Sequence, residues 1–214
     1  MSGQFPEKWS DWMETQIWPQ IWTMMTNDAI YRLMCHAREL TGEFNGPIAE
    51  LIRFGYVTSQ TIGIRKLCDD RKDVISLRRL LIEVGGKCLF ATGACGELSS
   101  KLDCCEPVCK LVNDYVAHTA NPSRRPSFSE WDLRVGQIVG AQRAICEVAV
   151  ALDRDVLQQS NPVTIIPVHQ DDVMKEFRPW VSEDDIDKLW EFWHEHNDQV
   201  NSWVTFRLAS FPVG

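Results

Sequence analysis

The segment from Asn113 to His118 carries the side chains best suited to chemistry in this chain. Asp114 lies four residues before His118, so in a helix its carboxylate sits nearly above the imidazole ring and can orient it. Asn113 adds a polar group one position earlier. A histidine held in this way can act as a general base near neutral pH. The alternative is that Asn113 and Asp114 face solvent and that His118 only ends a helix before the turn at Asn121-Pro122.

Basic residues that could bind a phosphate lie before and after this segment. The candidates are Arg65, Arg78, Lys110, Arg124 and Arg125. A structural role is the alternative, because Arg79 and Glu83 are spaced for an ion pair along a helix. The chain as a whole is acidic, with a formal net charge of -8 and a pI of about 5.1. This charge argues against a uniformly basic nucleic-acid-binding surface but is compatible with a local basic patch.

Eight cysteines are spread along the chain, mostly within apolar helical patterns, which predicts buried thiols rather than disulfides. Cys104-Cys105 and Cys109, with Cys95 nearby, come closest to a metal site. They lack the paired Cys-x-x-Cys spacing of zinc knuckles, so we expect no metal and no other cofactor. His194 and His196 are two positions apart and face different sides of a helix, so we interpret His196 as a core or interface histidine.

Helical periodicity runs through almost the whole chain, so the predicted fold class is all-α. The first long helix covers about residues 19–40 and ends near Gly42. The second begins after Gly46-Pro47 and should form an antiparallel hairpin with the first. Its apolar residues predicted to point inward are Ile48, Leu51, Ile52, Val57 and Ile62.

Further helices are predicted by their capping residues. Ser76 should cap a helix that buries Leu77, Leu80, Leu81 and Val84. A shorter helix after Pro107 delivers His118 to a surface edge, and another begins near Ser129. Proline-bracketed residues 161–167 form an extended arm, and a last helix begins at Ser182. Its apolar stripe, interpreted as a docking surface, is Leu189, Trp193, His196, Val200 and Trp203.

These elements suggest three regions: an aromatic-rich N-terminal segment (1–19), a main helical domain (20–154) and a C-terminal extension (155–214). No window approaches the roughly 18 uninterrupted apolar residues of a membrane span, so we expect a soluble protein. The N-terminus lacks a basic start followed by an apolar run, which favours a cytoplasmic location.

Two stretches carry a family resemblance. The first is Ile64-Arg65-Lys66-Leu67-Cys68-Asp69-Asp70 followed by Ile75-Ser76-Leu77-Arg78-Arg79-Leu80-Leu81. The second, Asn113 to Thr119, is similar to a signature in which an arginine is followed by a polar residue and, a few positions later, by Ala-His. Together they resemble the HEPN superfamily of helical prokaryotic defence and RNA-processing domains, in its abortive-infection, U-type branch. The resemblance covers about residues 20–154.

The resemblance implies a bundle of four or five main helices that forms a homodimer, with two signature helices facing each other across a cleft. It implies a toxin- or phage-defence-type endoribonuclease that needs no metal, with His118 as the base and Asn113 and Asp114 orienting it. An arginine holds the scissile phosphate in such sites. The implied partners are RNA or a nucleotide and a cognate antitoxin or neighbouring gene product.

The signature arginine is missing from this chain: Val112 stands where a six-residue separation from the histidine would place it, and Leu111 or Asn113 where the other allowed separations would. Losing a fixed cation at a phosphate typically reduces the rate by a factor of about hundreds to thousands. A ribonuclease would therefore need a cation from elsewhere in the chain. The alternatives are a non-catalytic HEPN-like module that binds RNA, a nucleotide or a protein, and an oligomeric helical scaffold built on the nine tryptophans.

Overall fold

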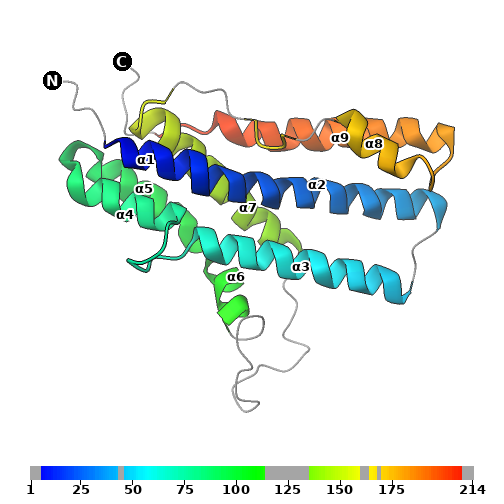
Figure 1. The fold of residues 1–214 in the computed structure, drawn as a ribbon, viewed down its shortest axis with the longest axis horizontal. Helices are drawn as coiled ribbons and strands as arrows, with labels where there is room; N and C mark the ends of the chain where they lie inside the picture. Colours follow the sequence, from blue (N-terminus) through cyan, green and yellow to red (C-terminus); the bar gives the residue numbers. More distant parts are fainter. Residues whose placement is uncertain (1–5, 43–45, 114–134, 160–163, 168–169, 209–214) are drawn as a thin grey trace, which may run out of the picture.

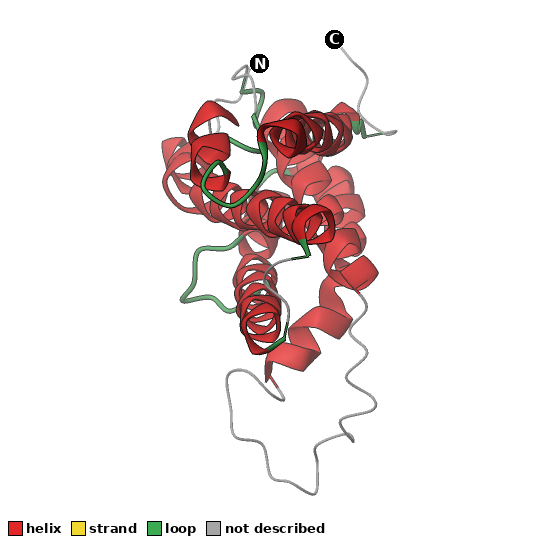
Figure 2. Ribbon diagram, turned by 90° about the vertical axis from the view of Figure 1, so that its right-hand side faces the viewer, coloured by secondary structure: helices red, strands yellow, loops and turns green. Residues whose placement is uncertain are grey.

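The computed structural model describes residues 6–42, 46–113, 135–159, 164–167 and 170–208. Within these ranges every regular element is helical, which confirms the all-α prediction (Figures 1 and 2). The longer helices are α2 (Trp18–Thr41), α3 (Pro47–Leu67), α4 (Leu77–Lys87), α5 (Thr92–Lys101), α7 (Val135–Ala151) and α9 (Glu183–Ser202). The shorter ones are α1 (Glu7–Trp12), α6 (Glu106–Leu111) and α8 (Gln170–Phe177). None of the described helices combines the length and the apolar composition needed to cross a lipid bilayer.

Single helical turns of other kinds connect these helices. In the described part of the chain, η1 (Met13–Ile17) and η7 (Leu152–Val156) are π-helical, and η2 (Leu89–Ala91), η3 (Leu102–Cys105) and η8 (Trp203–Thr205) are 3-10 turns. Because η1 joins α1 directly to α2, the N-terminal part of the chain is one continuous helical run along the bundle (Figure 1).

α2 and α3 form the predicted antiparallel hairpin (Figure 1). α2 ends where expected, because Gly42 adopts a left-handed conformation with φ of 72° and its amide donates to the Arg38 carbonyl at 2.9 Å. The prediction that Ile48 and Leu51 point inward from the first half of α3 is wrong, because these side chains are 58% and 71% exposed. α6 and α7 pack on α3 nearer its C-terminal end (Figure 1). Tyr56 is therefore the first residue along α3 whose side chain is almost completely buried.

Two predicted helix caps, Ser76 and Ser182, are confirmed, whereas the predicted start near Ser129 lies outside the described residues. The Ser76 hydroxyl accepts a hydrogen bond from the Arg79 amide at 3.0 Å and starts α4, whose predicted apolar face is buried. Arg79 and Glu83 form the expected ion pair along this helix, with 3.6 Å between Nη2 and Oε2. Ser182 caps α9 in the same way, by accepting from the Asp185 amide at 3.2 Å.

The apolar stripe of α9 packs against α2, so the surface interpreted from the sequence as a docking face belongs to the chain's own core. Its members Leu189, Trp193 and Val200 are almost completely buried. His196 is 8% exposed, which confirms the interpretation as a core histidine. One hydrophobic cluster extends from Trp9 in α1 to Leu208 after α9.

A cluster of polar side chains around the buried Asp28, the Asp28 cluster, joins four helices at the centre of this core. Its members are Asp28 and Arg32 from α2, Tyr56 and Gln60 from α3, Gln142 from α7 and His196 from α9. The Asp28 carboxylate, fully buried, accepts from the Tyr56 hydroxyl, from Arg32 Nε at 2.7 Å and from Gln142 Nε2 at 3.2 Å. His196 Nε2 lies 3.5 Å from the same carboxylate. No sequence pattern pointed to Asp28, Gln60 or Gln142 as members of such a cluster.

His196 and Tyr56 respond differently to this environment. Burial lowers the pKa of His196, against the opposing attraction of the Asp28 carboxylate. Burial and the charge of Asp28 both raise the pKa of Tyr56, so its hydroxyl stays protonated and donates. The cluster is therefore held by a carboxylate that accepts from Arg32 on its own helix and from Tyr56 and Gln142 on two other helices.

A second buried carboxylate, Asp153 in η7, has fewer partners. It is 3% exposed and accepts from Trp18 Nε1 at 3.3 Å, but its Oδ1 atom has no hydrogen-bond partner. Burial raises the pKa of Asp153 from 3.8 to about 6, despite the bond from Trp18. The folded chain therefore binds this proton more tightly than the unfolded chain does. The stability of the fold should fall as the pH rises from about 4 to about 6.

The substitution Asp153→Asn should raise the free energy of unfolding by about 2 kcal/mol at pH 7, because the amide keeps the acceptor for Trp18 without a buried charge. The gain should vanish below pH ~4, where the carboxyl is protonated in both states. Urea unfolding at the two pH values measures this difference. Asp155→Asn is the control, since Asp155 is paired with Arg154 at 2.6 Å and its loss should destabilise the fold at pH 7. A neutral or destabilising Asp153→Asn at pH 7 would contradict the expected cost of the buried charge.

Candidate functional site

A polar cavity of about 190 Å³ lies where the C-terminal end of α3 meets α4, α6 and η3. We call it the Arg65 cavity. Its lining residues are Arg65, Cys68, Asp70, Arg78, Leu102, Cys105, Glu106, Cys109 and Asn113. Three of the residues singled out from the sequence, Arg65, Arg78 and Asn113, therefore line one cavity.

Arg65 is fixed from two sides. Its Nε donates to Asn113 Oδ1 at 3.1 Å, and its Nη1 lies 2.8 Å from Asp69 Oδ2, one helical turn further along the chain. The side chain is 28% exposed, so it is neither free in solvent nor sealed in the core. The contact with Asn113 joins the end of α3 to the end of α6, and it places a guanidinium beside the polar residue of the predicted motif.

Asp69 anchors this arrangement. It is 7% exposed and also accepts from the amide and from Nε of Arg71, at 3.0 and 3.1 Å. Burial raises the pKa of Asp69, but the hydrogen bonds from Arg71 and Arg65 outweigh this effect and bring the pKa below its ordinary value. Asp69 is therefore ionised at neutral pH and orients the Arg65 guanidinium.

Arg78 enters the cavity from the first turn of α4. Its Nη2 lies 3.0 Å from Oδ1 of Asp103, which is largely exposed. Asp70 and Glu106 also line the cavity, and neither was identified as a site residue from the sequence. The two arginines are thus balanced by neighbouring carboxylates, and an anion that binds here has to compete with the partners of Arg65 and Arg78.

Three thiols form part of the cavity wall: Cys68, Cys105 and Cys109. Hydrogen bonding between the thiols and burial raise the pKa of both Cys68 and Cys109, so they are thiols at neutral pH rather than reactive thiolates. Of the cysteines considered together in the sequence, Cys104 is exposed and does not line this cavity, and neither does Cys95. Within the described part of the chain, no group of histidine, cysteine and acidic side chains is placed to hold a metal ion.

The other predicted site residues do not meet in this cavity within the described structure. Lys110 is exposed on α6 and is not part of the lining. Asp114, His118, Arg124 and Arg125 lie outside the described residues. Asn113, the last residue described before them, belongs to the cavity wall, so the predicted base is only five positions along the chain from the Arg65 cavity.

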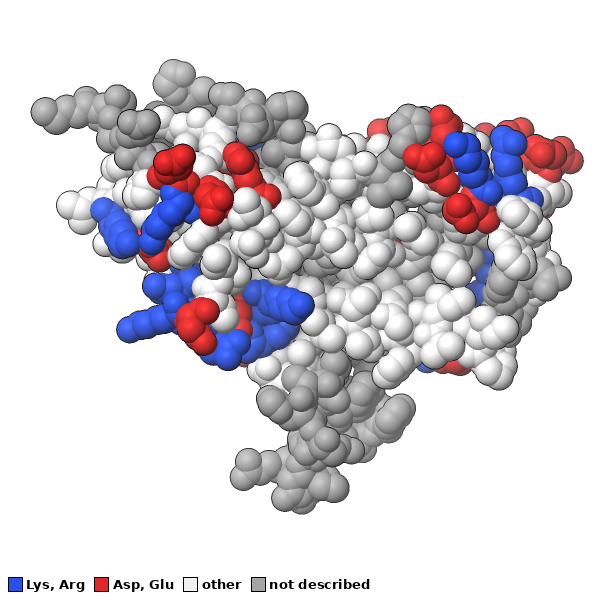
Figure 3. All heavy atoms as spheres, in the orientation of Figure 1, with Lys and Arg blue, Asp and Glu red and all other residues white. Residues whose placement is uncertain are grey.

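Positive charge gathers close to this cavity. Figure 3 shows lysine and arginine side chains, with a few acidic ones, over the connection between α3 and α4. Exposed members of this group are Lys66, Arg71 and Lys72. A local basic patch on an acidic protein is what the sequence allowed, and such a patch can attract a polyanion to this end of α3.

Comparison of the chain with protein-family models, with curated proteins and with solved structures finds no significant match.

Proposed function

We propose that this chain is a HEPN-like RNA-binding protein of the prokaryotic defence type, which cleaves RNA without a metal and acts in the cytoplasm. In this proposal His118 is the general base and Arg65 is the cation that holds the scissile phosphate. The observation that carries the proposal is the 3.1 Å hydrogen bond from Arg65 Nε to Asn113 Oδ1. It supports a role for Arg65 because Asn113 is the polar residue of the motif from which the arginine is missing.

The neighbourhood of Val112 explains why the cation has to come from another helix. Val112 stands where a six-residue separation would place the missing arginine and is 4% exposed. A charge at that position would be buried. Arg65 approaches from α3 instead and reaches the cavity wall beside Asn113. The proposed site thus contains the base and the cation of the family's motif, His118 and Arg65. The cation comes from α3 instead of from the motif itself.

The proposed reaction follows from these two groups. His118 takes the proton of a ribose 2′-hydroxyl, and the 2′-oxygen attacks the adjacent phosphorus. The bond from phosphorus to the 5′-oxygen breaks, the 5′-oxygen takes up a proton, and a 2′,3′-cyclic phosphate remains on the other fragment. A planar guanidinium suits the phosphate oxygens as negative charge develops on them, because it can donate two parallel hydrogen bonds.

The experiment is incubation of the purified protein with end-labelled single-stranded RNA in the presence of EDTA. The expected products are fragments that end in a cyclic phosphate, and His118→Ala should yield none of them. Equal cleavage by both proteins would assign the activity to another group or to a contaminant. Sedimentation of the same samples tests the homodimer that the proposal includes, and a strict monomer at micromolar concentration would contradict a shared cleft.

A non-catalytic module is the second candidate, and the acidic lining of the Arg65 cavity favours it. Asp70 and Glu106 line the cavity, and both arginines already have carboxylate partners. Such a module would bind RNA, a nucleotide or a cognate antitoxin without cutting. Retention of RNA by the unmodified protein, with no cleavage over hours, would support this candidate and reject the enzyme.

A further inference from the structure

A second cavity lies at the other end of the α2–α3 hairpin from the Arg65 cavity. It has a volume of about 340 Å³ and lies between the C-terminal half of α2, the first turns of α3, and the connection from α8 to α9. Its lining residues are Ile30, Tyr31, Met34, Cys35, Ala37, Arg38, Thr41, Ala49, Ile52, Glu176, Phe177, Trp180 and Val181. This volume lies within the range of about 300–1,000 Å³ that is typical of small-molecule sites.

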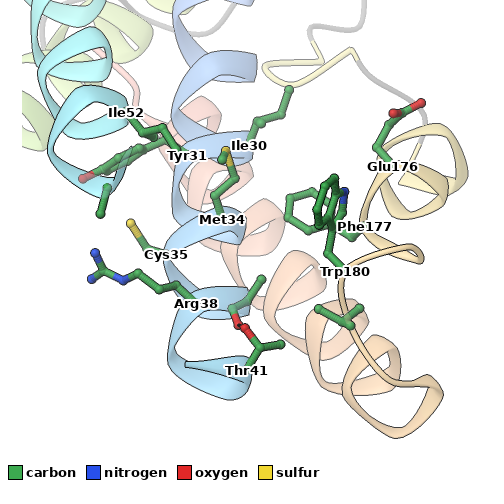
Figure 4. A pocket seen from close by; sticks show the side chains of 13 residues that line it. Ile30, Tyr31, Met34, Cys35, Arg38, Thr41, Ile52, Glu176, Phe177 and Trp180 are labelled. Carbon is green, nitrogen blue, oxygen red and sulfur yellow. Dashed lines mark hydrogen bonds between the residues drawn. The ribbon is translucent and has the colours of Figure 1, made fainter. Parts of the chain in front are cut away.

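One part of this cavity is apolar. Figure 4 shows Phe177 and Trp180 on the α8 side, with Ile30 and Met34 between them and the α3 side. Trp180 remains 59% exposed at the rim, which is unusual for the largest apolar side chain. These residues offer an open apolar wall that an alkyl chain or a flat ring can cover.

The opposite part of the cavity is polar. In Figure 4 the Tyr31 hydroxyl, the Cys35 thiol and the Arg38 guanidinium lie together, away from Phe177 and Trp180. Burial raises the pKa of Tyr31 to about 12, and the neighbouring charges of Arg53 and Arg38 act in the opposite direction. The cavity therefore has a cationic corner at one end and an apolar wall at the other.

Arg38 is partly buried and, among the described residues, has no carboxylate partner. Its neighbours on the same helices differ in this respect. Arg32 Nε lies 2.7 Å from Asp28, and Arg53 Nη2 lies 2.7 Å from Glu50. The acid of the cavity, Glu176, lies on the α8 side in Figure 4. A partly desolvated guanidinium gains most from an anionic hydrogen-bond acceptor, so an anion is the complement that this corner lacks.

We propose that this cavity binds a small amphipathic carboxylate, whose head group contacts Arg38 and the Tyr31 hydroxyl while its apolar tail lies against Met34, Phe177 and Trp180. A carboxylate matches the planar guanidinium, and the tail covers apolar surface that is otherwise in contact with water. This site is separate from the Arg65 cavity and does not depend on the RNA-related function.

Through Tyr31, a ligand in this cavity would be linked to the Asp28 cluster at the centre of the bundle. The Tyr31 ring stacks on Tyr56, with 3.8 Å between centroids and 6° between planes, and Tyr56 donates to Asp28. Because Tyr31 forms part of the cavity wall, a ligand packed on it adds contacts present only in the folded chain. Binding should therefore raise the melting temperature.

The test is calorimetric titration of the purified protein with decanoate and with decanol, both below their aggregation concentrations. Decanoate should bind more tightly than decanol, because only the acid carries the charge that complements Arg38. Arg38→Gln should weaken decanoate binding by about tenfold or more and leave decanol unchanged, as expected for the loss of one charge-assisted contact. Arg143→Gln is the matched control, because Arg143 lies on α7, pairs with Glu147 at 2.7 Å and does not line this cavity, and it should bind decanoate like the parent protein.

A second variant locates the site. Met34→Trp fills the space between the two ends of the cavity and should abolish binding of both compounds, while circular dichroism reports whether the fold is retained. If Met34→Trp unfolds, Ile30→Trp on the same wall serves the same purpose. The proposal is overturned if the parent protein does not bind decanoate, if Arg38→Gln binds it equally well, or if decanol binds as tightly as decanoate.

Discussion

Replacing Asp28 with alanine should lower the free energy of unfolding by about 3–5 kcal/mol, one of the largest effects expected of a single substitution in this chain. Asp28 is fully buried and is the common acceptor for Arg32, Tyr56 and Gln142. The substitution removes that acceptor and leaves three donors on three helices without it. Buried donors that lose their partners carry the full cost of their desolvation.

Urea unfolding followed by circular dichroism at pH 7 measures this loss. Asp172→Ala is the matched control, because Asp172 is 71% exposed and its ion pair with Lys175 is 3.4 Å long on the surface. It should change the stability by less than about 0.5 kcal/mol. If Asp28→Ala were as mild as the control, the Asp28 cluster would not hold the four helices together.

Replacing Arg65 with alanine should reduce the rate of RNA cleavage by a factor of about 100 to 1,000, the usual result of removing a fixed cation at a reacting phosphate. Arg65→Lys should recover only part of the activity, because an ammonium cannot reproduce the two-pronged contact of a guanidinium. Single-turnover cleavage of labelled RNA measures the rate of the chemical step for each protein.

Arg71→Ala controls for indirect effects of this substitution. Arg71 binds the same carboxylate, Asp69, but is exposed and does not line the Arg65 cavity. Its loss disturbs the Asp69 anchor without removing the proposed phosphate ligand, so the rate should fall by less than about tenfold. Equal losses in the two variants would mean that Arg65 acts only through Asp69, and the assignment of Arg65 as the phosphate-binding cation would be rejected.

The ends of the helices were predictable from the sequence because they depend on local chemistry. Ser76 and Ser182 accept from amides three residues ahead, and Gly42 takes the left-handed conformation that ends α2. The inward face of α3 was not predictable, since its first half carries Ile48 and Leu51 where few helices cover it. Apolar periodicity indicates which residues share a face, but not whether another helix lies against that face.

Buried polar residues were the main omission. Asp28, Gln60 and Gln142 are unremarkable in the sequence, and polar side chains in helices usually face solvent. Their burial depends on donors and acceptors that come from α2, α3 and α7 at once, which no local pattern reveals. The π-helical turns η1 and η7 were not predicted either.

The residues of the candidate site were easier to predict than their contacts. Arg65 and Asn113 were both identified from motifs, but they are 48 positions apart, and their hydrogen bond became visible only in the folded chain. Cys105 and Cys109 are four residues apart and share a helix face, which was a usable signal for two of the three cavity thiols. Cys68 completes the group from another helix, and nothing in its spacing indicated this.

The affinity for a 2′-O-methyl RNA, measured by fluorescence anisotropy at several salt concentrations, tests most directly whether Arg65 binds a phosphate. This RNA cannot form the cyclic product, so the measurement reports binding alone. We expect Arg65→Ala to bind more weakly than the parent protein and to reduce the slope of log affinity against log salt by about 0.7, the value for one phosphate contact on a single strand. Arg53→Ala is the control, because Arg53 lies near the other end of α3, pairs with Glu50 and does not line the Arg65 cavity, and it should leave the slope equal to that of the parent protein. Identical affinities and slopes for Arg65→Ala and the parent protein would contradict the claim that Arg65 binds a phosphate of the RNA.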